Sequence, residues 1–172
     1  MLRGKAFKFG DNISTDDIAP GRWFHLRSNL PELAKHVLED VKPDFASKVK
    51  PGDFIVAGKN FGLGSSREHA AIIIKMAGVS AILAKSGARI FFRNAVNVGL
   101  PVLICDTDKI EDGDEIEVDL KGSRARDVTN GAELSLGRFP DVMLKILDEG
   151  GLIPYIKKYG DFTVQPRKGG AS

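Results

Sequence analysis

A single cysteine, Cys105, is present among the 172 residues of the chain. One thiol cannot form an intramolecular disulfide, a zinc site built on several cysteines, or an iron–sulfur cluster whose ligands all come from this chain. Cys105 follows the apolar run at residues 100–104, so we expect it to pack as a small hydrophobic side chain. The chain by itself is therefore expected to bind no metal and no cofactor.

The sequence also lacks an excess of charge and any long apolar run. Its 25 lysines and arginines balance 23 aspartates and glutamates, and the net charge of +2 gives no general attraction to nucleic acid or membranes. No segment approaches the roughly 20 apolar residues of a membrane span, and the first five residues contain no signal-peptide core. We expect a cytoplasmic protein with neither a nucleic-acid nor a membrane partner.

Length and composition fit one domain over residues 1–172. Hydrophobic residues make up 42% and charged residues 28%, which is ordinary for a globular protein and excludes wholesale disorder. A domain of this length buries roughly 70% of its unfolded surface, so it needs no covalent staples to fold. We expect the tail from Tyr155 onward, and residues 163–172 in particular, to be frayed.

Short apolar runs alternate with helical patterns through the middle of the chain. Three of these runs predict buried strands, at residues 54–57, 79–84 and 102–104. Helical patterns at residues 67–77 and 88–98 separate them, which predicts a parallel or mixed sheet with crossover helices. Strict alternation at residues 114–120 and 133–136 predicts additional antiparallel strands with one wet face. The predicted fold class is α/β.

Residues 11–28 show no periodicity and are rich in Asp, Ser, Thr, Pro and Gly, which predicts a long loop. Loops longer than about 12 to 15 residues are commonly functional. This loop follows a predicted strand at residues 6–9 and precedes a short predicted helix at residues 33–38. A last helix is predicted at residues 141–147, directly after Pro140.

The sharpest local signal lies at residues 58–70, between a predicted strand and a predicted apolar helix. Ser65 and Glu68 have the spacing of a capping box, which places the start of the helix there. Gly64 and the other glycines of the segment allow tight turns and a close approach of the backbone to a ligand. Free N–H groups, the positive helix end and the Arg67 guanidinium predict an anion site, and a carboxylate fits the guanidinium bidentately.

Plainer interpretations compete with an anion site. A capping box is common, and alone it indicates only a well-capped helix with a structural arginine. Nucleotide sites fit poorly, because residues 62–67 lack the third glycine of a dinucleotide turn and no Gly-Lys-Ser/Thr follows.

Residues 58–70 resemble the signature of the swivelling domain of the aconitase superfamily. Residues 11–16 resemble the family's second motif, and residues 88–95 with residues 99–101 match a third. The three motifs keep the family order, and the resemblance extends to about Phe162. A stand-alone chain of this length is similar to the small subunits of 3-isopropylmalate dehydratase and of archaeal-type homoaconitase.

The resemblance implies a swivelling β/β/α domain that closes the active site of a large partner subunit. In the family that partner carries a [4Fe-4S] cluster, which agrees with the single cysteine here. The implied reaction is a dehydration followed by a rehydration, which moves a hydroxyl group to the neighbouring carbon of a malate-type hydroxy acid. The commonest such activity is that of 3-isopropylmalate dehydratase, in leucine biosynthesis.

By motif position, the resemblance makes Ser65 the base that removes the proton beside a carboxylate. The resemblance also assigns Gly64, Ser66 and Arg67 to substrate binding. Four further residues are expected to support the site: Thr15, Asp16, Glu68 and His69. Leu63 stands where many relatives have cysteine, at a position that we take as supporting, so the assignment is little affected.

Arg27 leaves the substrate open. It lies in residues 23–28, which resemble the segment that sets substrate choice in relatives. An apolar group there suits an isopropyl side chain, whereas an arginine suits an extra carboxylate, as in homoaconitate- or aconitate-like acids; a solvated loop arginine is the plain interpretation. A more distant alternative is a non-catalytic carboxylate-binding module on the same fold, which would need Arg67 and have no need of Ser65.

A serine base needs assistance, because its hydroxyl ionises far above neutral pH. A helix terminus supplies at most about 2 kcal/mol, which corresponds to about 1.5 pKa units. Preorganised hydrogen-bond donors in a dry site supply roughly 2.7–4 kcal/mol each. Such a site requires the partner subunit, so we expect the chain alone to be inactive.

Overall fold

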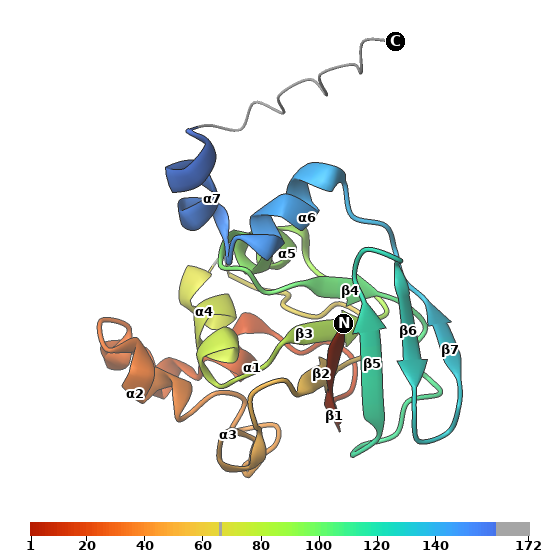
Figure 1. Cartoon of the computed structure of the whole chain (residues 1–172). Helices are drawn as coiled ribbons and strands as arrows, with labels where there is room; N and C mark the ends of the chain where they lie inside the picture. Colours follow the sequence, from red (N-terminus) through yellow and green to blue (C-terminus); the bar gives the residue numbers. More distant parts are fainter. Residues whose placement is uncertain (66, 161–172) are drawn as a thin grey trace.

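The computed structural model describes residues 1–65 and 67–160 (Figure 1). Its strands are β1 (Leu2–Lys8), β2 (Phe54–Val56), β3 (Ala81–Ala84), β4 (Val102–Ile104), β5 (Glu115–Asp119), β6 (Arg124–Asp127) and β7 (Glu133–Ser135). Its helices are α1 (Thr15–Ile18), the 3₁₀ helix η1 (Gly21–Leu26), α2 (Leu30–Ala34), α3 (Phe45–Lys48), α4 (Glu68–Met76), α5 (Arg89–Asn97), α6 (Asp141–Asp148) and α7 (Leu152–Tyr159). None of the described helices is long and apolar enough to cross a membrane.

All seven strands belong to one mixed sheet with the order β4-β3-β2-β1-β5-β6-β7. Strands β1 to β4 run parallel to one another, and β5, β6 and β7 continue the sheet beyond β1 in antiparallel pairs. Parallel neighbours need long crossovers, which α4 and α5 provide between β2, β3 and β4. The predicted α/β class and the mixed sheet are confirmed.

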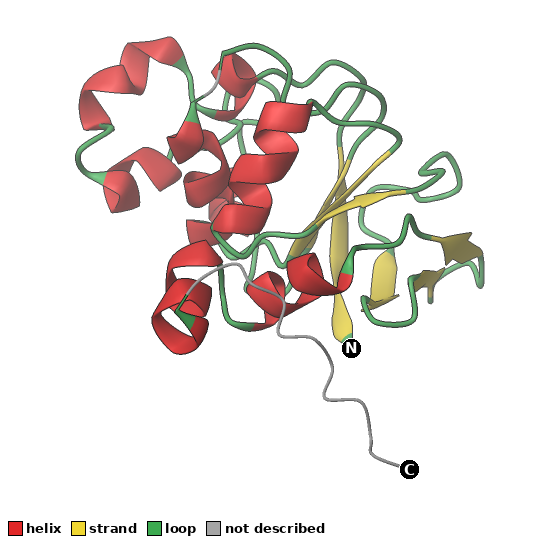
Figure 2. Ribbon diagram, turned by 90° about the horizontal axis from the view of Figure 1, so that it is seen from above, coloured by secondary structure: helices red, strands yellow, loops and turns green. Residues whose placement is uncertain are grey.

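The two faces of the sheet bury separate cores, because successive strand residues point to opposite faces. In β2, Ile55 packs into a core with the helices, whereas Phe54 and Val56 pack into a second core with the antiparallel strands. In β3, Ile82 and Leu83 divide in the same way. Figure 2 shows the helices gathered to one side of the parallel strands.

The sheet curls, so that the segment after β7 returns to the other edge strand. The Leu136 amide donates to the Ser123 carbonyl, and the Gly137 amide donates to the Ile104 carbonyl at the end of β4, both at 3.0 Å. This curl closes the second core, in which Cys105 is buried as the sequence predicts.

Residues 11–28 contain more structure than the predicted loop, because α1 and η1 lie within them. The helix predicted at residues 33–38 begins earlier, as α2. Neither α3 nor β6 is anticipated by the sequence; the buried positions of β6 are Ala125 and Asp127, which do not signal a strand.

A frayed tail from Tyr155 onward is wrong for the first residues of that segment. They belong to α7, and the side chain of Tyr155 is buried against Val96 and Ile146. The remainder of the predicted tail, including residues 163–172, lies outside the described residues.

Candidate functional site

Loops that follow three of the parallel strands meet at the carboxyl edge of the sheet. The Gly62 amide donates to the Ile13 carbonyl at 2.7 Å, which joins the loop after β2 to the loop after β1. The Phe61 amide donates to the Ser86 carbonyl at 3.1 Å, which joins it to the loop after β3. Open α/β folds bind ligands in the crevice at this edge of the sheet. The predicted anion-binding segment therefore lies where the fold favours a site.

Glycines make two close approaches in the loop after β2. A Cβ on Gly58 would lie 1.8 Å from Oδ1 of Asp11, the oxygen that accepts the Lys59 amide at 2.7 Å. Gly62 has a φ of +78°, and a Cβ there would lie 2.2 Å from the ring of Phe91. The glycines thus allow the loop to pack tightly against the neighbouring loop and α5.

Ser65 is exposed at the end of this loop and is held from α1. The buried Thr15 hydroxyl donates to the Ser65 carbonyl at 3.1 Å, and its oxygen lies 3.4 Å from Ser65 Oγ. The Ser65 carbonyl also accepts the Arg67 amide at 2.8 Å. These bonds fix the backbone at Ser65 while its side chain faces solvent.

The capping box predicted for Ser65 and Glu68 is wrong. Helix α4 begins at the exposed Glu68, its N-cap residue is Arg67, and no side chain caps it. A capping box closes α1 instead, where Ser14 Oγ accepts the Asp17 amide at 3.0 Å and Asp17 Oδ2 accepts the Ser14 amide at 2.9 Å. The rigid anchor of Ser65 is therefore α1, and Ser65 lies outside α4.

Arg67 is directed back towards the α1 region. Its Nη1 donates to the Ala19 carbonyl at 3.1 Å, and its Nη2 lies 2.8 Å from Oδ1 of Asp16. A guanidinium has five N–H donors in a planar fork, so these two contacts orient it and leave donors for a ligand. The Asp16 side chain is 66% exposed, so a ligand carboxylate can compete with it.

A second guanidinium and an imidazole lie beside Arg67, around the ring of Phe24. The guanidinium carbons of Arg27 and Arg67 are 4.4 and 5.7 Å from the centre of that ring, and the His69 ring meets it edge-on at 6.1 Å. Burial lowers the pKa of His69, and the positive charges of Arg67 and Arg27 lower it further. The group forms a positively charged patch suited to a ligand with more than one carboxylate.

The structure therefore brings together most of the residues that the sequence singles out. Thr15 contacts Ser65 and Asp16 contacts Arg67, and Gly64 is exposed beside them. Ser66 lies outside the described residues. Sequence reasoning missed Phe24, which is 45% exposed despite its size. Its spacing of three residues from Arg27, within a helical turn, is the signal that could have found it.

The described residues do not fit a metal or an iron–sulfur cluster. Burial raises the pKa of Cys105 to about 12, with a smaller contribution from Asp106, so this thiol is a poor ligand. The described part of the chain contains no group of three or more His, Cys, Asp and Glu side chains that could hold a metal ion.

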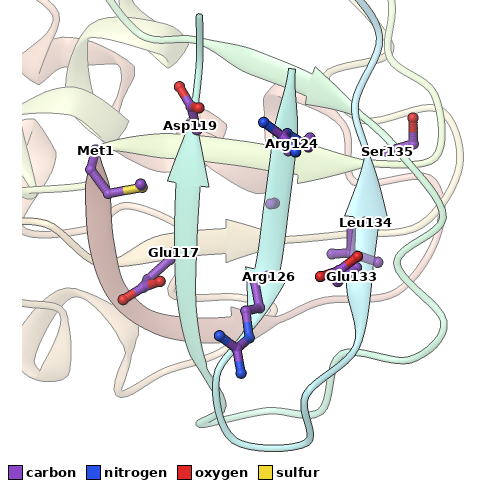
Figure 3. A pocket seen from close by; sticks show the side chains of 9 residues that line it. Met1, Glu117, Asp119, Arg124, Arg126, Glu133, Leu134 and Ser135 are labelled. Atoms are coloured by element: carbon purple, nitrogen blue, oxygen red, sulfur yellow. The ribbon is translucent and has the colours of Figure 1, made fainter. Parts of the chain in front are cut away.

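Hollows on the described part of the chain lie away from Ser65, and two of them are lined by arginines. One, of about 450 Å³, opens on the antiparallel strands β5 to β7, where Glu117, Arg124 and Arg126 are among its lining residues (Figure 3). The other, of about 590 Å³, lies between α5 and α6 and includes Arg89 and Arg93. None of the predicted site residues lines either hollow.

Comparison with known proteins relates the chain to one family. Residues 27–106 match the family described as the aconitase C-terminal domain. The 3-isopropylmalate dehydratase small subunit 2 of Archaeoglobus fulgidus is 65% identical over 161 residues, which cover 94% of this chain and 98% of that protein. The small subunit 1 of the same enzyme from Thermotoga maritima is 63% identical, with the same coverage of both chains.

Two further relatives bear on the fold and on the substrate. The methanogen homoaconitase small subunit of Methanothermobacter thermautotrophicus is 49% identical and covers 98% of both chains. The crystal structure of 3-isopropylmalate dehydratase from Methanocaldococcus jannaschii is similar with a TM-score of 0.87 and 46% identity, covering 92% of this chain and 95% of that one.

Proposed function

The chain belongs to the aconitase-type family of dehydratase small subunits, and from this premise we propose that it serves 3-isopropylmalate dehydratase. With a large subunit it would convert 2-isopropylmalate into 3-isopropylmalate, by removing water and adding it back in the opposite sense. The Archaeoglobus fulgidus and Thermotoga maritima relatives, at 65% and 63% identity, bear that name, and the homoaconitase subunit is less similar at 49%.

One observation carries the proposal. An exposed serine, Ser65, is fixed by α1 at the carboxyl edge of the sheet, next in space to the patch formed by Arg67, Arg27 and His69. A hydroxy diacid needs both features, namely a base for a carbon-bound proton and cations for its carboxylates. A module that only binds carboxylates would not need a base.

Ser65 is proposed as the base. In the first half-reaction its oxygen takes the proton from the carbon beside a carboxylate, and the hydroxyl group leaves the neighbouring carbon, so that water is lost overall. In the second half, water adds back with its hydroxyl on the carbon that lost the proton, and the proton goes to the other carbon. The contacts from Thr15 hold the Ser65 backbone, so the reacting oxygen stays in place.

Arg67 and Arg27 are proposed to bind the two substrate carboxylates, with support from Gly64 and Ser66. Arg67 is already oriented by Ala19 and Asp16, which reduces the entropy lost when a carboxylate binds. The lowered pKa of His69 keeps its imidazole neutral over more of the physiological range, so the arginines supply the charge.

We further propose that the iron–sulfur cluster of this enzyme type resides on the large subunit. The name small subunit in the relatives implies such a partner. With Cys105 buried and a poor ligand, the described residues offer the cluster no binding site. The role of this chain is confined to the base, the carboxylate donors and the closure of the site.

The test is turnover by the reconstituted two-subunit complex with Ser65→Ala. General-base catalysis is worth about 10²–10⁴-fold, so we expect kcat to fall by at least about 100-fold while the affinity for substrate, measured by equilibrium dialysis, stays close to that of the wild type. Ser47→Ala, at an exposed serine of α3, is the matched control. If Ser65→Ala retains both turnover and binding, the carboxylate-binding module is the better description.

The second candidate is a homoaconitase-type activity on a tricarboxylic acid, and Arg27 favours it. Its guanidinium stands over Phe24 beside Arg67, where an extra carboxylate could bind both. The candidates are separated by the acid that the wild-type complex converts with the lower KM, and Arg27→Val should raise the KM for that acid, because Arg27 is assigned to a substrate carboxylate in either case. The measurement is KM for each acid with the wild-type and variant complexes.

A further inference from the structure

The segment that carries Phe24 and Arg27 is held to the rest of the fold by side chains, including those of Trp23 and Leu26, which pack against the main core. We call residues 21–27 the recognition arm; it comprises η1 and Arg27. No residue of η1 is fully buried. The backbone hydrogen bonds within the arm are local, from the Trp23 amide to the Pro20 carbonyl and from the Arg27 amide to the Phe24 carbonyl. Side chains must therefore hold the arm in place.

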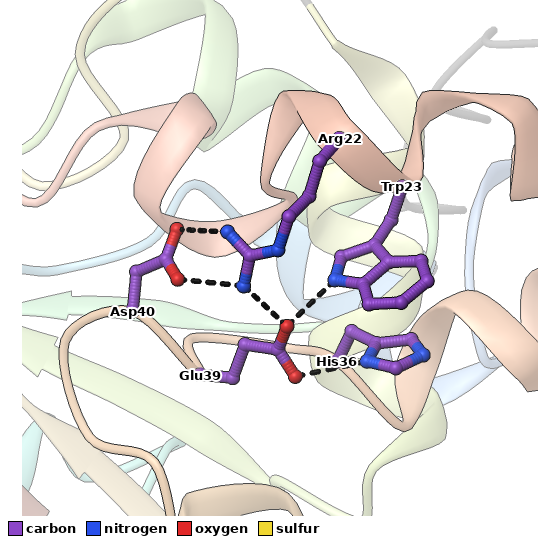
Figure 4. A network of polar contacts seen from close by, with 5 residues as sticks. All are labelled: Arg22, Trp23, His36, Glu39 and Asp40. Atoms are coloured by element: carbon purple, nitrogen blue, oxygen red, sulfur yellow. Dashed lines mark hydrogen bonds and ion pairs between the residues drawn. The ribbon is translucent and has the colours of Figure 1, made fainter.

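The Glu39 carboxylate accepts hydrogen bonds from the side chains that hold the arm (Figure 4). Its Oε1 accepts the indole N–H of Trp23 at 2.6 Å and also a guanidinium N–H of Arg22. Its Oε2 lies 2.8 Å from Nδ1 of His36, in the turn after α2. One carboxylate thus joins two consecutive residues of the arm to the segment that follows α2.

Two further contacts complete this attachment. Asp40 accepts the Arg22 guanidinium bidentately, with N···O distances of 2.9 and 2.7 Å. The rings of Trp23 and His36 stack with centroids 3.8 Å apart and an angle of 15° between their planes. Burial would raise the pKa of Glu39, but hydrogen bonds from His36, Trp23 and Arg22 outweigh it and hold that pKa below its ordinary value. Glu39 is therefore ionised at neutral pH.

The geometry of the arm transmits this attachment to the substrate site. In a 3₁₀ helix, residues three apart lie on the same side, so Phe24 and Arg27 share a side of the arm. Trp23 is offset by a third of a turn and faces Glu39, so fixing the indole fixes the direction in which Phe24 and Arg27 point. A rotation of the arm would carry the Arg27 guanidinium away from Arg67 and His69.

We propose that Glu39 is a positioning residue, which sets the affinity for substrate by holding the recognition arm and, through it, Arg27. The proposal rests on the proposed function, because it assigns Arg27 to substrate binding. Among the described residues, the contacts of Glu39 include none of those given to the chemistry. Its loss should therefore affect binding much more than the reaction at Ser65.

The kinetic test uses the two-subunit complex with Glu39→Ala. We expect KM to rise about tenfold, the scale of one charge-assisted hydrogen bond, with kcat within about twofold of the wild type. Glu39→Gln keeps an acceptor for Trp23 and should recover part of the affinity. Glu32→Ala is the matched control, because Glu32 lies on α2 and forms an exposed ion pair with Lys35.

A double-mutant cycle shows whether Glu39 acts through Arg27. In an Arg27→Ala background, Glu39→Ala should raise KM by less than twofold further, because the arm then no longer carries a ligand-binding guanidinium. Independent effects that multiply would overturn the proposal. So would an unchanged KM in Glu39→Ala, or a kcat that falls in parallel with the affinity.

Trp23 reports on the arm directly, since it is the one tryptophan of the chain. In the isolated full chain, Glu39→Ala should increase quenching of its fluorescence by acrylamide, whereas Glu32→Ala should not. Equal quenching in all three proteins would contradict the attachment. The quenching experiment does not depend on enzymatic activity. If the wild-type complex converts no hydroxy acid, the proposed function is wrong, and fluorescence still tests whether Glu39 holds the arm.

Discussion

Asp127, in β6, is a carboxylate buried without full compensation. Its side chain is inaccessible to solvent, and Oδ1 accepts the amides of Thr129 and Asn130 at 3.0 and 3.3 Å. Oδ2 has no hydrogen-bond partner among the described residues. Burial raises the pKa of Asp127, and the neighbouring carboxylate of Asp114 raises it further. The folded protein therefore holds a proton at this site more tightly than the unfolded chain does.

The stability contribution of that proton depends on pH in a definite sense. It is fully present below the unfolded pKa of about 3.9 and is lost as the pH rises through the higher folded value of Asp127. Asp127→Asn replaces the lone Oδ2 by a donor while its oxygen still accepts the two amides. We expect the variant to be more stable at pH 7, by about 1 kcal/mol, and to lose this pH dependence.

Thermal unfolding at a series of pH values from about 4 to 8 measures both effects, and about 1 kcal/mol corresponds to a rise in Tm of roughly 2–4 °C. Asp119→Asn is the matched control, because Asp119 lies on the neighbouring strand and is partly exposed, capping a turn at the Gly122 amide. A lower Tm at pH 7 for Asp127→Asn, or an unchanged pH profile, would show that the buried carboxylate is compensated.

Among the connecting elements, the loop after β2 depends on Gly62. Its φ of +78° is unfavourable for other residues, and a Cβ would overlap the ring of Phe91. Left-handed strain costs about 1–2 kcal/mol and overpacking typically a further 1–3 kcal/mol. We expect Gly62→Ala to lower the free energy of unfolding by about 3 kcal/mol, measured by urea titration of the isolated chain.

A variant at Gly113 separates the cost of backbone strain from the cost of the overlap with Phe91. It has a φ of +86° but no atom within 4 Å of the position that a Cβ would take. Gly113→Ala should therefore show the backbone strain alone, about 1–2 kcal/mol. Equal losses in the two variants would mean that the ring of Phe91 moves aside without cost, which would contradict tight packing of the loop against α5.

Two possible capping boxes, each beginning with a serine, show how well local sequence predicts the start of a helix. Both Ser65 with Glu68 and Ser14 with Asp17 have capping-box spacing, yet only the second pair forms the box. The difference lies in tertiary contacts: Thr15, directly after Ser14, is buried, whereas the loop at Ser65 is held by bonds to α1. The pattern predicts that a helix starts nearby and cannot say which side chain caps it.

Short helices held by long-range contacts escape prediction for the same reason. The four residues of α1 and the six of η1 are too few for periodicity to appear, and η1 is fixed by Glu39 from outside the segment. Longer amphipathic elements such as α5 are predicted within a residue or two. The motif at residues 58–70 allows most residues of the candidate site to be predicted from the sequence. The position of Phe24 beside them depends on how the recognition arm packs, which the sequence does not show.

Taken as a whole, the molecule leaves its candidate site open to solvent. Ser65 is exposed, and so are Gly64 and the Arg27 side of the recognition arm. A site open to water weakens electrostatic stabilisation, because the effective dielectric stays high. Ser65 also lies outside α4, so even the modest contribution of a helix terminus, at most about 2 kcal/mol, is reduced. The hydroxyl cannot become an effective base under these conditions.

We therefore expect the purified chain to show no turnover of 2-isopropylmalate or of homoaconitate-type acids. Addition of the large subunit should create the activity, because closure excludes water and supplies further donors, each worth roughly 2.7–4 kcal/mol in a dry site. The measurement is formation of the unsaturated acid as the large subunit is titrated in, and the rate should saturate at a fixed subunit ratio. Turnover by the chain alone would contradict this expectation. It would mean that residues of this chain, such as Thr15 and Arg67, make Ser65 basic enough without the subunit interface.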